Sequence, residues 1–322
     1  MGRLDVSKIK RFDLLIIALV FIALIPAAKV HRLIDFMVFA IFVLSFDLLY
    51  GYMGRLSFGH MLYFGTGAYA AALFGQYVSP NPILALLFAL VAGVLVGLVL
   101  GLVVVRTTGA SFALINLAFN EVGFFLAVTA FARYTGGEDG MSASFARLGF
   151  IDFGNPQVFF VTALCVLLLV FYVMKRFSAS PYGALLRGIK ENEVRVRFLG
   201  YNTFLLKWVT FSISTGIAAL AGALSSANFA YVTTSFIDPQ RNVEVIFAAL
   251  IGGPGTLYGA VIGGTIYMAI SNYLASYITR WEMFLGLALL VLVFRFPKGI
   301  GGYLAGLTQA RHAHGKAERQ GM

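Results

Sequence analysis

Long apolar runs recur along almost the whole of this 322-residue chain. Each run has about 20 residues, which is the length that an α-helix needs to cross the hydrocarbon core of a bilayer. Only helices and closed barrels can span lipid, because every backbone hydrogen bond there has to be made within the protein. The runs are continuous rather than alternating in hydrophobicity, which excludes an outer-membrane barrel. The sequence therefore predicts an all-α, polytopic membrane protein.

The composition supports this class and limits the partners. Charged residues make up only 12% of the chain, against about 25% in a soluble domain. The net charge of +10 is also compatible with nucleic-acid binding, but basic residues on cytoplasmic loops explain it better. We therefore expect contact with the lipid bilayer and no nucleic acid as a partner. The single cysteine, Cys165, lies in an apolar run, so we expect it to pack there rather than form a disulfide or a zinc site.

The apolar runs predict about ten spans in one transmembrane domain, residues 1–322. The predicted spans are Phe12–Ala28, Leu33–Met53, Leu56–Val78, Ile83–Val105, Ala110–Phe131, Gln157–Met174, Trp208–Ala227, Val243–Gly252, Leu257–Ile278 and Met283–Phe296. The eighth is short and broken by glycine, so eight spans remain an alternative. The first imitates a signal peptide, but because further spans follow we expect a retained helix. Residues 303–322 are expected to form a flexible cytoplasmic tail.

The distribution of basic residues predicts the orientation of the chain. With both termini in the cytoplasm, about three quarters of the 24 Lys and Arg residues fall inside, as the positive-inside rule requires. This result supports an even number of spans. Most acidic residues of the loops then lie outside, some of them in the polar stretches Ala132–Pro156 and Asn228–Asn242.

One basic stretch, Lys175–Lys207, interrupts the apolar pattern and holds seven of the Lys and Arg residues. Ser180 and Pro181 are typical of a helix start, with a capping hydroxyl followed by proline in the first turn. Gly200 fits a helix end. We therefore expect one or two short amphipathic helices at the membrane surface. Such a stretch is either a solvated connector or a place where a soluble partner docks.

Several polar residues lie within or beside predicted spans, where such residues are costly and usually face a bundle interior or water. They are Asp47, Ser57, His60, Asn116, Asn120 and Glu121. Asn116 and Asn120 are four residues apart and share one helix face, with Glu121 adjacent to that face. We interpret the group as a lining along a permeation route, or alternatively as hydrogen bonds that fix the helices to one another.

Two glycine-broken segments, Gly51–Ala72 and Ile251–Gly264, occupy the two halves of the chain. Paired interruptions of this kind point to an internal structural repeat and a central pathway. Glycines at every fourth position, Gly93, Gly97 and Gly101, instead predict close packing of one helix on another.

The sequence contains no convincing catalytic motif. It has no G-x-x-x-x-G-K-[ST] phosphate-binding loop and no H-E-x-x-H zinc motif. His312 and His314 in the tail are a weak metal signal, and we expect neither a metal nor a cofactor. Because the chain has no Walker motif with which to bind ATP, an energy source would lie in a partner or in an ion gradient.

Ordered blocks along most of the chain resemble the branched-chain amino-acid ABC importer permeases of the LivM type. The longest block, Ser180–Leu224, contains most of the basic stretch and the apolar run after it. Other blocks in matching order are Leu48–Leu73, Gly109–Val122, Thr135–Ser142, Ala249–Gly264 and Phe294–Gly302. The segment Val194–Phe198, which follows Glu-Asn-Glu, is bulkier and more basic than is usual in that family.

The resemblance implies a multi-pass subunit of an ATP-binding-cassette importer in the bacterial inner membrane. Our hypothesis is that it works by alternating access, driven by ATP that binds to a partner. The resemblance implies as partners two cytosolic ABC ATPase subunits, a second related permease subunit and a periplasmic substrate-binding protein. The ATPase-coupling residues that it assigns are Tyr182, Arg187, Glu191, Asn192, Glu193, Arg197, Leu199 and Gly200. The implied substrates are branched-chain amino acids, or related solutes such as urea, amides or aromatic acids. The alternative is a secondary transporter in which Glu121 and Asp47 couple an ion gradient.

Overall fold

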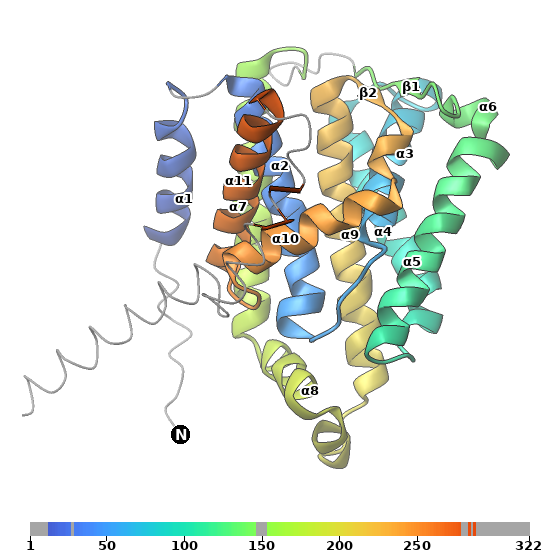
Figure 1. The fold of residues 1–322 in the computed structure, drawn as a ribbon, viewed down its shortest axis with the longest axis vertical. Coiled ribbons are helices and arrows are strands. Elements are labelled where there is room, and N and C mark those ends of the chain that lie inside the picture. Colours follow the sequence, from blue (N-terminus) through green and yellow to red (C-terminus); the bar gives the residue numbers. More distant parts are fainter. Residues whose placement is uncertain (1–11, 27–28, 146–152, 278–282, 285, 288–322) are drawn as a thin grey trace, which may run out of the picture.

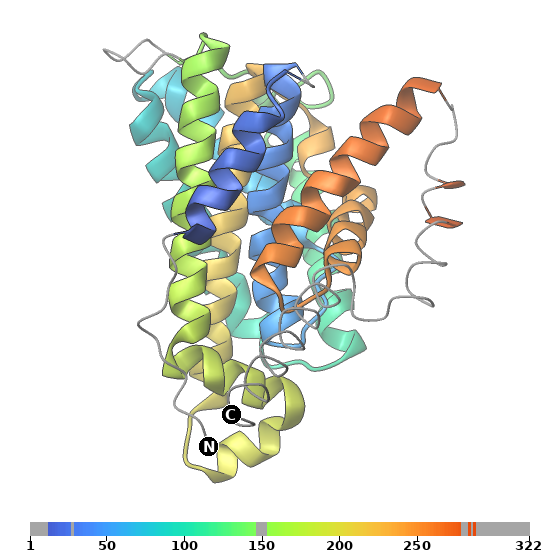
Figure 2. The ribbon, with the colours of Figure 1, turned by 90° about the vertical axis from the view of Figure 1, so that its left-hand side faces the viewer.

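The chain forms a bundle of helices that lie side by side (Figure 1). The structure is a computed structural model, and it describes residues 12–26, 29–145, 153–277, 283, 284, 286 and 287. The longer helices are α1 (Phe12–Ala23), α2 (Val30–Asp47), α3 (His60–Tyr77), α4 (Pro82–Val104), α5 (Ala110–Phe125), α7 (Pro156–Ala179), α8 (Pro181–Phe198), α9 (Thr203–Phe229), α10 (Asn242–Gly252) and α11 (Leu257–Tyr277). Figure 2 shows the bundle turned by 90°, with α8 at its lower end.

The helical content confirms the predicted all-α polytopic fold. Helices α2 and α5 each continue through a π-helical turn, Leu48–Tyr52 and Leu126–Ala130. Counted with these turns, α2, α4, α5, α7 and α9 are long and apolar enough to cross a membrane. The tenth predicted span, Met283–Phe296, lies almost wholly outside the described residues, so the count of ten spans stays a prediction. The predicted tail, 303–322, lies entirely outside them.

Local sequence explains where several helices begin. The side chains of Asn81, Asn155 and Asn202 each accept a hydrogen bond from a backbone N–H in the first turn of α4, α7 and α9. These bonds satisfy N–H groups that have no partner inside the helix. Pro82 and Pro156 follow directly, in the first helical position, where the missing N–H of proline removes no helical bond.

Some helix boundaries differ from the predicted ones. Helix α3 begins at His60, four residues after the predicted start, because the chain between α2 and α3 turns through Gly54 at φ +73°. Helix α7 continues to Ala179 and α9 already begins at Thr203. Both helices extend beyond their apolar runs, and hydropathy alone does not detect these polar extensions. The predicted basic loop is therefore mostly helical, with α8 between the polar ends of α7 and α9.

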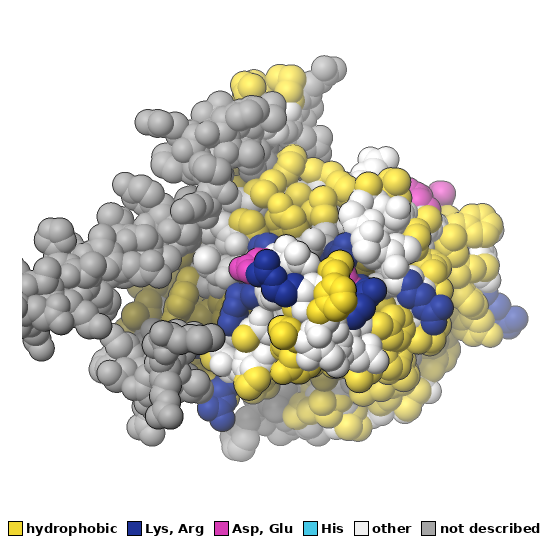
Figure 3. Space-filling view, turned by 90° about the horizontal axis from the view of Figure 1, so that it is seen from below, with side chains coloured by type: hydrophobic (Ala, Val, Ile, Leu, Met, Phe, Trp, Pro, Cys, Tyr) yellow, Lys and Arg dark blue, Asp and Glu magenta, His cyan; other side chains and the backbone are white. Residues whose placement is uncertain are grey.

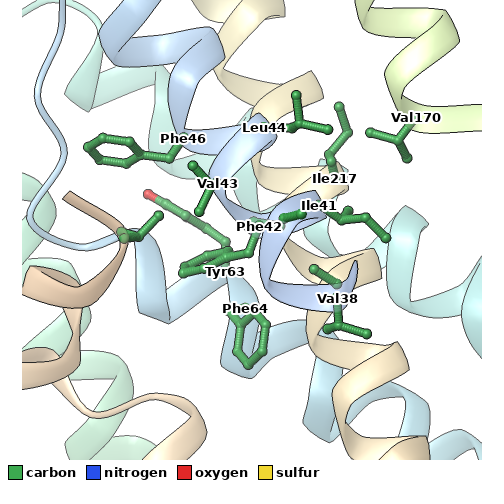
Figure 4. Packing of buried hydrophobic residues seen from close by; sticks show 14 of the residues in the cluster. Val38, Ile41, Phe42, Val43, Leu44, Phe46, Tyr63, Phe64, Val170 and Ile217 are labelled. Carbon is green, nitrogen blue, oxygen red and sulfur yellow. The ribbon is translucent and has the colours of Figure 1, made fainter. Parts of the chain in front are cut away.

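Helix α2 lies in the interior of the bundle. In α2, 83% of the apolar span is buried, against 28% in α4 and in α5. Figure 4 shows Phe42, Val43 and Phe46 of α2 near Tyr63 and Phe64 of α3. The rings of Phe42 and Phe64 lie 4.8 Å apart, centroid to centroid. Together with its contacts to α7, α9 and α11, this makes α2 the core of the described bundle.

Helices α4 and α9 pack through the predicted glycine row. A Cβ atom added at Gly97 would lie 1.9 Å from Oγ1 of Thr215, and one at Gly93 would lie 2.3 Å from Cβ of Ala219. Gly101 faces the ring of Trp208 in the same way. The two backbones can approach only because these positions carry no side chain. The prediction of close packing is confirmed.

A two-stranded antiparallel ribbon lies at the end of the bundle opposite α8 (Figure 1). Strand β1 (Met141–Ser142) pairs with β2 (Tyr231–Val232), with Met141 opposite Val232. Near β1 lies the short helix α6 (Ala132–Thr135), and β2 is followed by two 3₁₀ turns, Thr234–Phe236 and Pro239–Arg241. The ribbon joins the two polar stretches that the sequence placed outside.

Helix α10 crosses the bundle instead of running along it (Figures 1 and 2). It has 11 residues and is therefore about 16 Å long, about half the thickness of a bilayer core. Gly253 ends it at φ +94°, and Gly255, at φ +87°, lies two residues before α11. The predicted glycine break in the second half of the chain is thus a short helix, a turn and a full helix.

Candidate functional site

Helix α8 consists of two short helical pieces that meet at Asn192. Oγ of Ser180 accepts a hydrogen bond from the backbone N–H of Gly183 at 3.3 Å, so Ser180 caps the first piece as predicted. Asn192 has an extended backbone, and its Oδ1 accepts a bond from the N–H of Arg195 at 3.0 Å. The second piece ends at Phe198, followed by Gly200 at φ +87°. Both the predicted start and the predicted stop are confirmed.

The first piece of α8 is fixed to the bundle by its apolar face and by its neighbours. The side chains of Leu186 and Ile189 are buried. The hydroxyl of Tyr182 donates to the carbonyl of Leu206 in α9 at 2.7 Å. Nη1 of Arg187 donates to the carbonyl of Ser178 in α7 at 2.9 Å. These contacts hold α8 against the ends of the two helices that it connects.

Glu193 is the electrostatic centre of this end of the bundle. Its carboxylate accepts from Nζ of Lys207 at 2.7 Å and pairs with Nη2 of Arg55 at 2.8 Å. Oγ1 of Thr203 donates to it at 3.1 Å, and Nη2 of Arg197 lies 3.4 Å away. Burial raises the pKa of Glu193, but the bond from Lys207 and the neighbouring cations outweigh burial and hold that pKa below its usual value. The carboxylate therefore stays ionised and ties α8 to α9 and to the chain before α3.

A second contact connects α8 to the first glycine-broken segment. Nζ of Lys190 donates to the carbonyl of Gly51 at 2.7 Å. A Cβ atom added at Gly54 would lie 2.7 Å from Cγ of Lys190, so the segment lies directly on this side chain. Lys190 and Glu193 therefore hold one segment, residues 51–55, from two positions on α8.

The two glycine-broken segments themselves are in contact. The backbone N–H of Gly255 donates to Oδ1 of Asp47 at 2.7 Å. A Cβ atom added at Gly51 would lie 2.3 Å from the backbone nitrogen of Gly255. Only glycine at position 51 allows this approach. A continuous set of contacts thus runs from α8 through Gly51 to the turn between α10 and α11.

The outer face of α8 carries apolar side chains among basic ones, which Figure 3 shows from below. Phe198 is 87% exposed and Leu199 is 69% exposed. Glu191, Arg195 and Arg197 are exposed beside them. A groove of about 380 Å³ between the two helical pieces is lined by side chains that include Leu185, Val196, Leu199 and Tyr201. Exposed aromatic and aliphatic side chains beside charges are characteristic of a protein-binding surface.

The predicted polar face of α5 is buried and hydrogen-bonded. Oδ1 of Asn116 accepts from the hydroxyl of Tyr63 at 3.0 Å. Nδ2 of Asn120 donates to the carbonyl of Ile237 at 2.7 Å, and its Oδ1 accepts from Nδ2 of Asn242 at 2.7 Å. Asn242 also accepts from the backbone N–H of Met61 at 2.8 Å. The two asparagines share one face, as predicted, and join α5 to α3 and α10.

His60 and Ser57 lie inside the bundle at the start of α3. Nε2 of His60 lies 2.9 Å from Oγ of Ser45, and its ring packs against Phe42 and Phe46. Its Nδ1 has no hydrogen-bond partner within the described part of the chain. Oγ of Ser57 accepts a long bond, 3.4 Å, from the N–H of Gly59. Both side chains are fully buried, so neither faces an open cavity in this conformation.

Glu121 lies apart from the asparagines. Asn116 and Asn120 are buried, whereas Glu121 is exposed on another side of α5. Exposed with it are Leu114, Ala118, Val122 and Phe125. The structure therefore divides the predicted polar group into an internal network and one carboxylate on the surface of a membrane helix.

Sequence reasoning missed several residues that the structure brings to these sites. Arg55, Lys190 and Lys207 bind partners more than ten residues away, and Asn242 joins three elements. The sequence signal for Lys190 was its place beside the Glu-Asn-Glu sequence, and that for Asn242 its place at the end of a polar stretch. The described residues contain no group of three or more His, Cys, Asp or Glu side chains that could hold a metal ion, and His312 and His314 lie outside them.

The chain is similar to known proteins over most of its length. A family model described as "Branched-chain amino acid transport system / permease component" matches residues 30–294, which include every site above. The chain belongs to this permease family. The permease is therefore a component of a transport system, and its family is not an ATPase family.

Two relatives named LivM cover most of the length of the permease, and one named LivH covers less than half of it. It is 26% identical to the high-affinity branched-chain amino acid transport system permease protein LivM of Salmonella typhimurium, over 91% of this chain and 75% of the relative. The probable LivM of Methanocaldococcus jannaschii is 27% identical over 76% of this chain and 81% of the relative. LivH of Escherichia coli is 32% identical over 45% of this chain and 46% of the relative. No solved structure matches the permease.

Proposed function

We propose that this permease is the membrane-spanning subunit of an ATP-binding-cassette importer that passes branched-chain amino acids, or related small solutes, into the cytoplasm. The observation that carries the proposal is the construction of α8. Its outer face is exposed and apolar among charges, while its inner face is bonded to the glycine-broken segment through Lys190 and Glu193. A helix with these two faces is suited to receive a movement from outside the membrane and to pass it into the bundle. The names of the relatives support the substrate class.

The proposed orientation places the α8 end in the cytoplasm of a bacterial cell and both termini on the same side. The basic stretch at that end supports this placement. The β1–β2 ribbon then lies outside, where a periplasmic substrate-binding protein would dock. Pairing of the two outer stretches through Met141 and Val232 supports the ribbon as one continuous docking surface.

Two ATPase subunits and a second permease subunit complete the proposed assembly. The exposed α8 residues Glu191 and Arg197, and Leu199 directly after α8, would contact an ATPase. The exposed face of α5 would border the second permease and the route between the two subunits. The support is energetic, because Glu121 on that face is a carboxylate in a membrane helix, and facing lipid would be costly.

In the proposed mechanism, ATP-driven closure of the ATPases moves α8, and Lys190 and Arg55 carry that movement to the Gly51 segment. The turn at Gly255 then moves with the Gly51 segment, because the N–H of Gly255 is hydrogen-bonded to Asp47. The bundle then alternates between two states, whose balance each partner shifts by binding one of them better. We further propose that Asp47, Ser57, His60, Asn116 and Asn120 line the route in the alternate state, because they surround the segments that would move.

Purification of a tagged permease with its partners tests the proposal. We expect ATPase subunits to copurify, and the reconstituted complex to take up leucine only when ATP and the binding protein are present. Glu191→Lys should abolish ATPase retention, whereas Arg133→Glu, an exposed reversal near the other end, should not. Uptake driven by an ion gradient without ATP would instead establish a secondary transporter.

A further inference from the structure

A hollow of about 400 Å³ lies in the half of the bundle nearer the β1–β2 ribbon. Residues of α2, α3, α9, α10 and α11 line it, together with the chain that follows β2. It is separate from the α8 end, because none of its lining residues belongs to the contacts of Lys190 or Glu193. Its volume is in the range of small-molecule sites.

One wall of this hollow is aromatic and apolar. It is formed by Phe39 and Phe42 of α2, Met61 and Phe64 of α3, Phe229 at the end of α9, and Met268 of α11. Phe42 and Phe64 are buried and pack on each other, so this wall belongs to the core and is fixed in position. A rigid apolar wall of this kind suits an aliphatic side chain.

Charged side chains line the same hollow. Nε and Nη2 of Arg241 face the carboxylate oxygens of Glu244 at 2.8 and 3.3 Å, and Nη1 donates to the carbonyl of Ser235 at 3.2 Å. Asp35 is half-buried, and its Oδ1 accepts from Nδ2 of Asn228 at 2.7 Å. Each charge is therefore held in a defined direction before any ligand arrives.

The ion pair of Arg241 and Glu244 leaves capacity for a ligand. The side chain of Arg241 is 41% exposed and that of Glu244 is 23% exposed, so neither is sealed by the pair. The lining includes two carboxylates, Asp35 and Glu244, for one guanidinium. The ammonium group of a zwitterion can pair with the carboxylates of this hollow, and its carboxylate can pair with Arg241. Guanidinium groups make bidentate contacts with carboxylates.

We propose that this hollow is a transit site for an α-amino acid with an aliphatic side chain. The ammonium group binds at Asp35 and Glu244, the carboxylate binds Arg241, and the side chain lies against Phe39, Phe42 and Phe64. This inference rests on the proposed transport function and narrows its substrate, because urea and short amides carry neither the two charges nor the aliphatic chain.

Photo-labelling of the intact, reconstituted complex tests the site without any variant. The probe is a leucine analogue that carries a diazirine, supplied with the binding protein and ATP. We expect labelled peptides from α2 and α3 that contain Phe39, Phe42 or Phe64, and we expect excess leucine, but not urea, to prevent labelling. Labelling confined to other segments, in a complex that takes up leucine, would overturn the site.

Substitutions give a second readout on the same complex. Arg241→Gln and Phe64→Ala should each raise the KM for leucine at least about tenfold, which corresponds to about 1.4 kcal/mol of binding free energy. ATP hydrolysis stimulated by the unloaded binding protein should persist in both. The matched control is Arg176→Gln, an exposed arginine of α7 that lies outside both the hollow and the β1–β2 ribbon. Unchanged KM values in both variants would contradict the site, whereas absence of ATP-driven uptake in the unmodified complex would contradict the transport function itself.

Discussion

At the α8 end of the permease the carboxylate of Glu193 is enclosed by Arg55, Lys207 and Thr203, whereas at the ribbon end Arg241 and Glu244 face a hollow. Both regions contain ion pairs with N–O distances of 2.8 Å or less, but the side chains of Arg55 and Lys207 are only 13% and 6% exposed, against 41% for Arg241. Enclosed charges hold segments of chain together, while charges open to a cavity remain available to a ligand. We therefore propose that the same chemistry serves a mechanical role at one end and a binding role at the other.

The largest difference in stability between the two ends is expected when the glutamate of each ion pair is replaced by glutamine. Glu193→Gln leaves two largely buried cations without their carboxylate, which costs about 3 kcal/mol. Glu244→Gln removes a partly exposed pair, for which about 0.2–1 kcal/mol is typical. We expect a clear fall in the unfolding temperature of the detergent-solubilised protein for Glu193→Gln and a small one for Glu244→Gln.

Arg197 provides the control for that measurement. Its side chain is 68% exposed and lies at the edge of the Glu193 cluster, so Arg197→Gln should cost only about 0.3–0.5 kcal/mol. Equal losses of stability for Glu193→Gln and Arg197→Gln would contradict the view that the centre of the cluster is enclosed.

A smaller effect, on coupling rather than stability, is expected at Lys190. Lys190→Met keeps the aliphatic stem that packs on Gly54 but removes the bond to the Gly51 carbonyl. We expect leucine transported per ATP hydrolysed to fall at least about fivefold, in line with a coupling free energy of about 1 kcal/mol. Arg176→Met, an exposed substitution on α7 outside the face of α8, should leave this ratio unchanged. An intact ratio for Lys190→Met would mean that this bond carries no movement.

Acidification should produce the smallest effect. Because the pKa of Glu193 in the folded protein lies below its usual value of 4.5, its contribution to stability is complete above that value and is lost as the pH falls through the lowered pKa. The difference in unfolding temperature between the wild type and Glu193→Gln should therefore be constant from pH 7 to about pH 5 and shrink at lower pH. A difference that already shrinks between pH 7 and pH 6 would show that the carboxylate is not stabilised by its cations.

Features that depend on residues close together in the sequence were predictable. The ends of α8 were predictable, because Ser180, Pro181 and Gly200 act through local capping and backbone geometry. The shared face of Asn116 and Asn120 was predictable from helical spacing. Both depend on residues that are close in sequence.

Contacts between distant residues were not predictable in the same way. Lys190 and Gly51 are 139 positions apart, and Gly255 and Asp47 are 208 apart, so their contact depends on how the whole bundle packs. The hollow beside Arg241 likewise combines residues from five helices. Hydropathy identified the helices, and the glycine row identified one packing face of α4, but a single sequence does not say which helix that face meets.

We propose that the exposed face of α8 receives a separate ATPase, and site-directed cross-linking can test this claim. In a variant with Cys165 replaced by alanine, a cysteine would be placed at Leu199, directly after α8, or, as control, at Tyr231 of β2. Both residues are exposed. We predict that a short thiol-reactive cross-linker joins Leu199→Cys to the ATPase subunit, with a yield that changes on adding ATP, and that Tyr231→Cys gives no such product. Absence of an ATPase adduct at Leu199→Cys in a complex that still takes up leucine would contradict the claim.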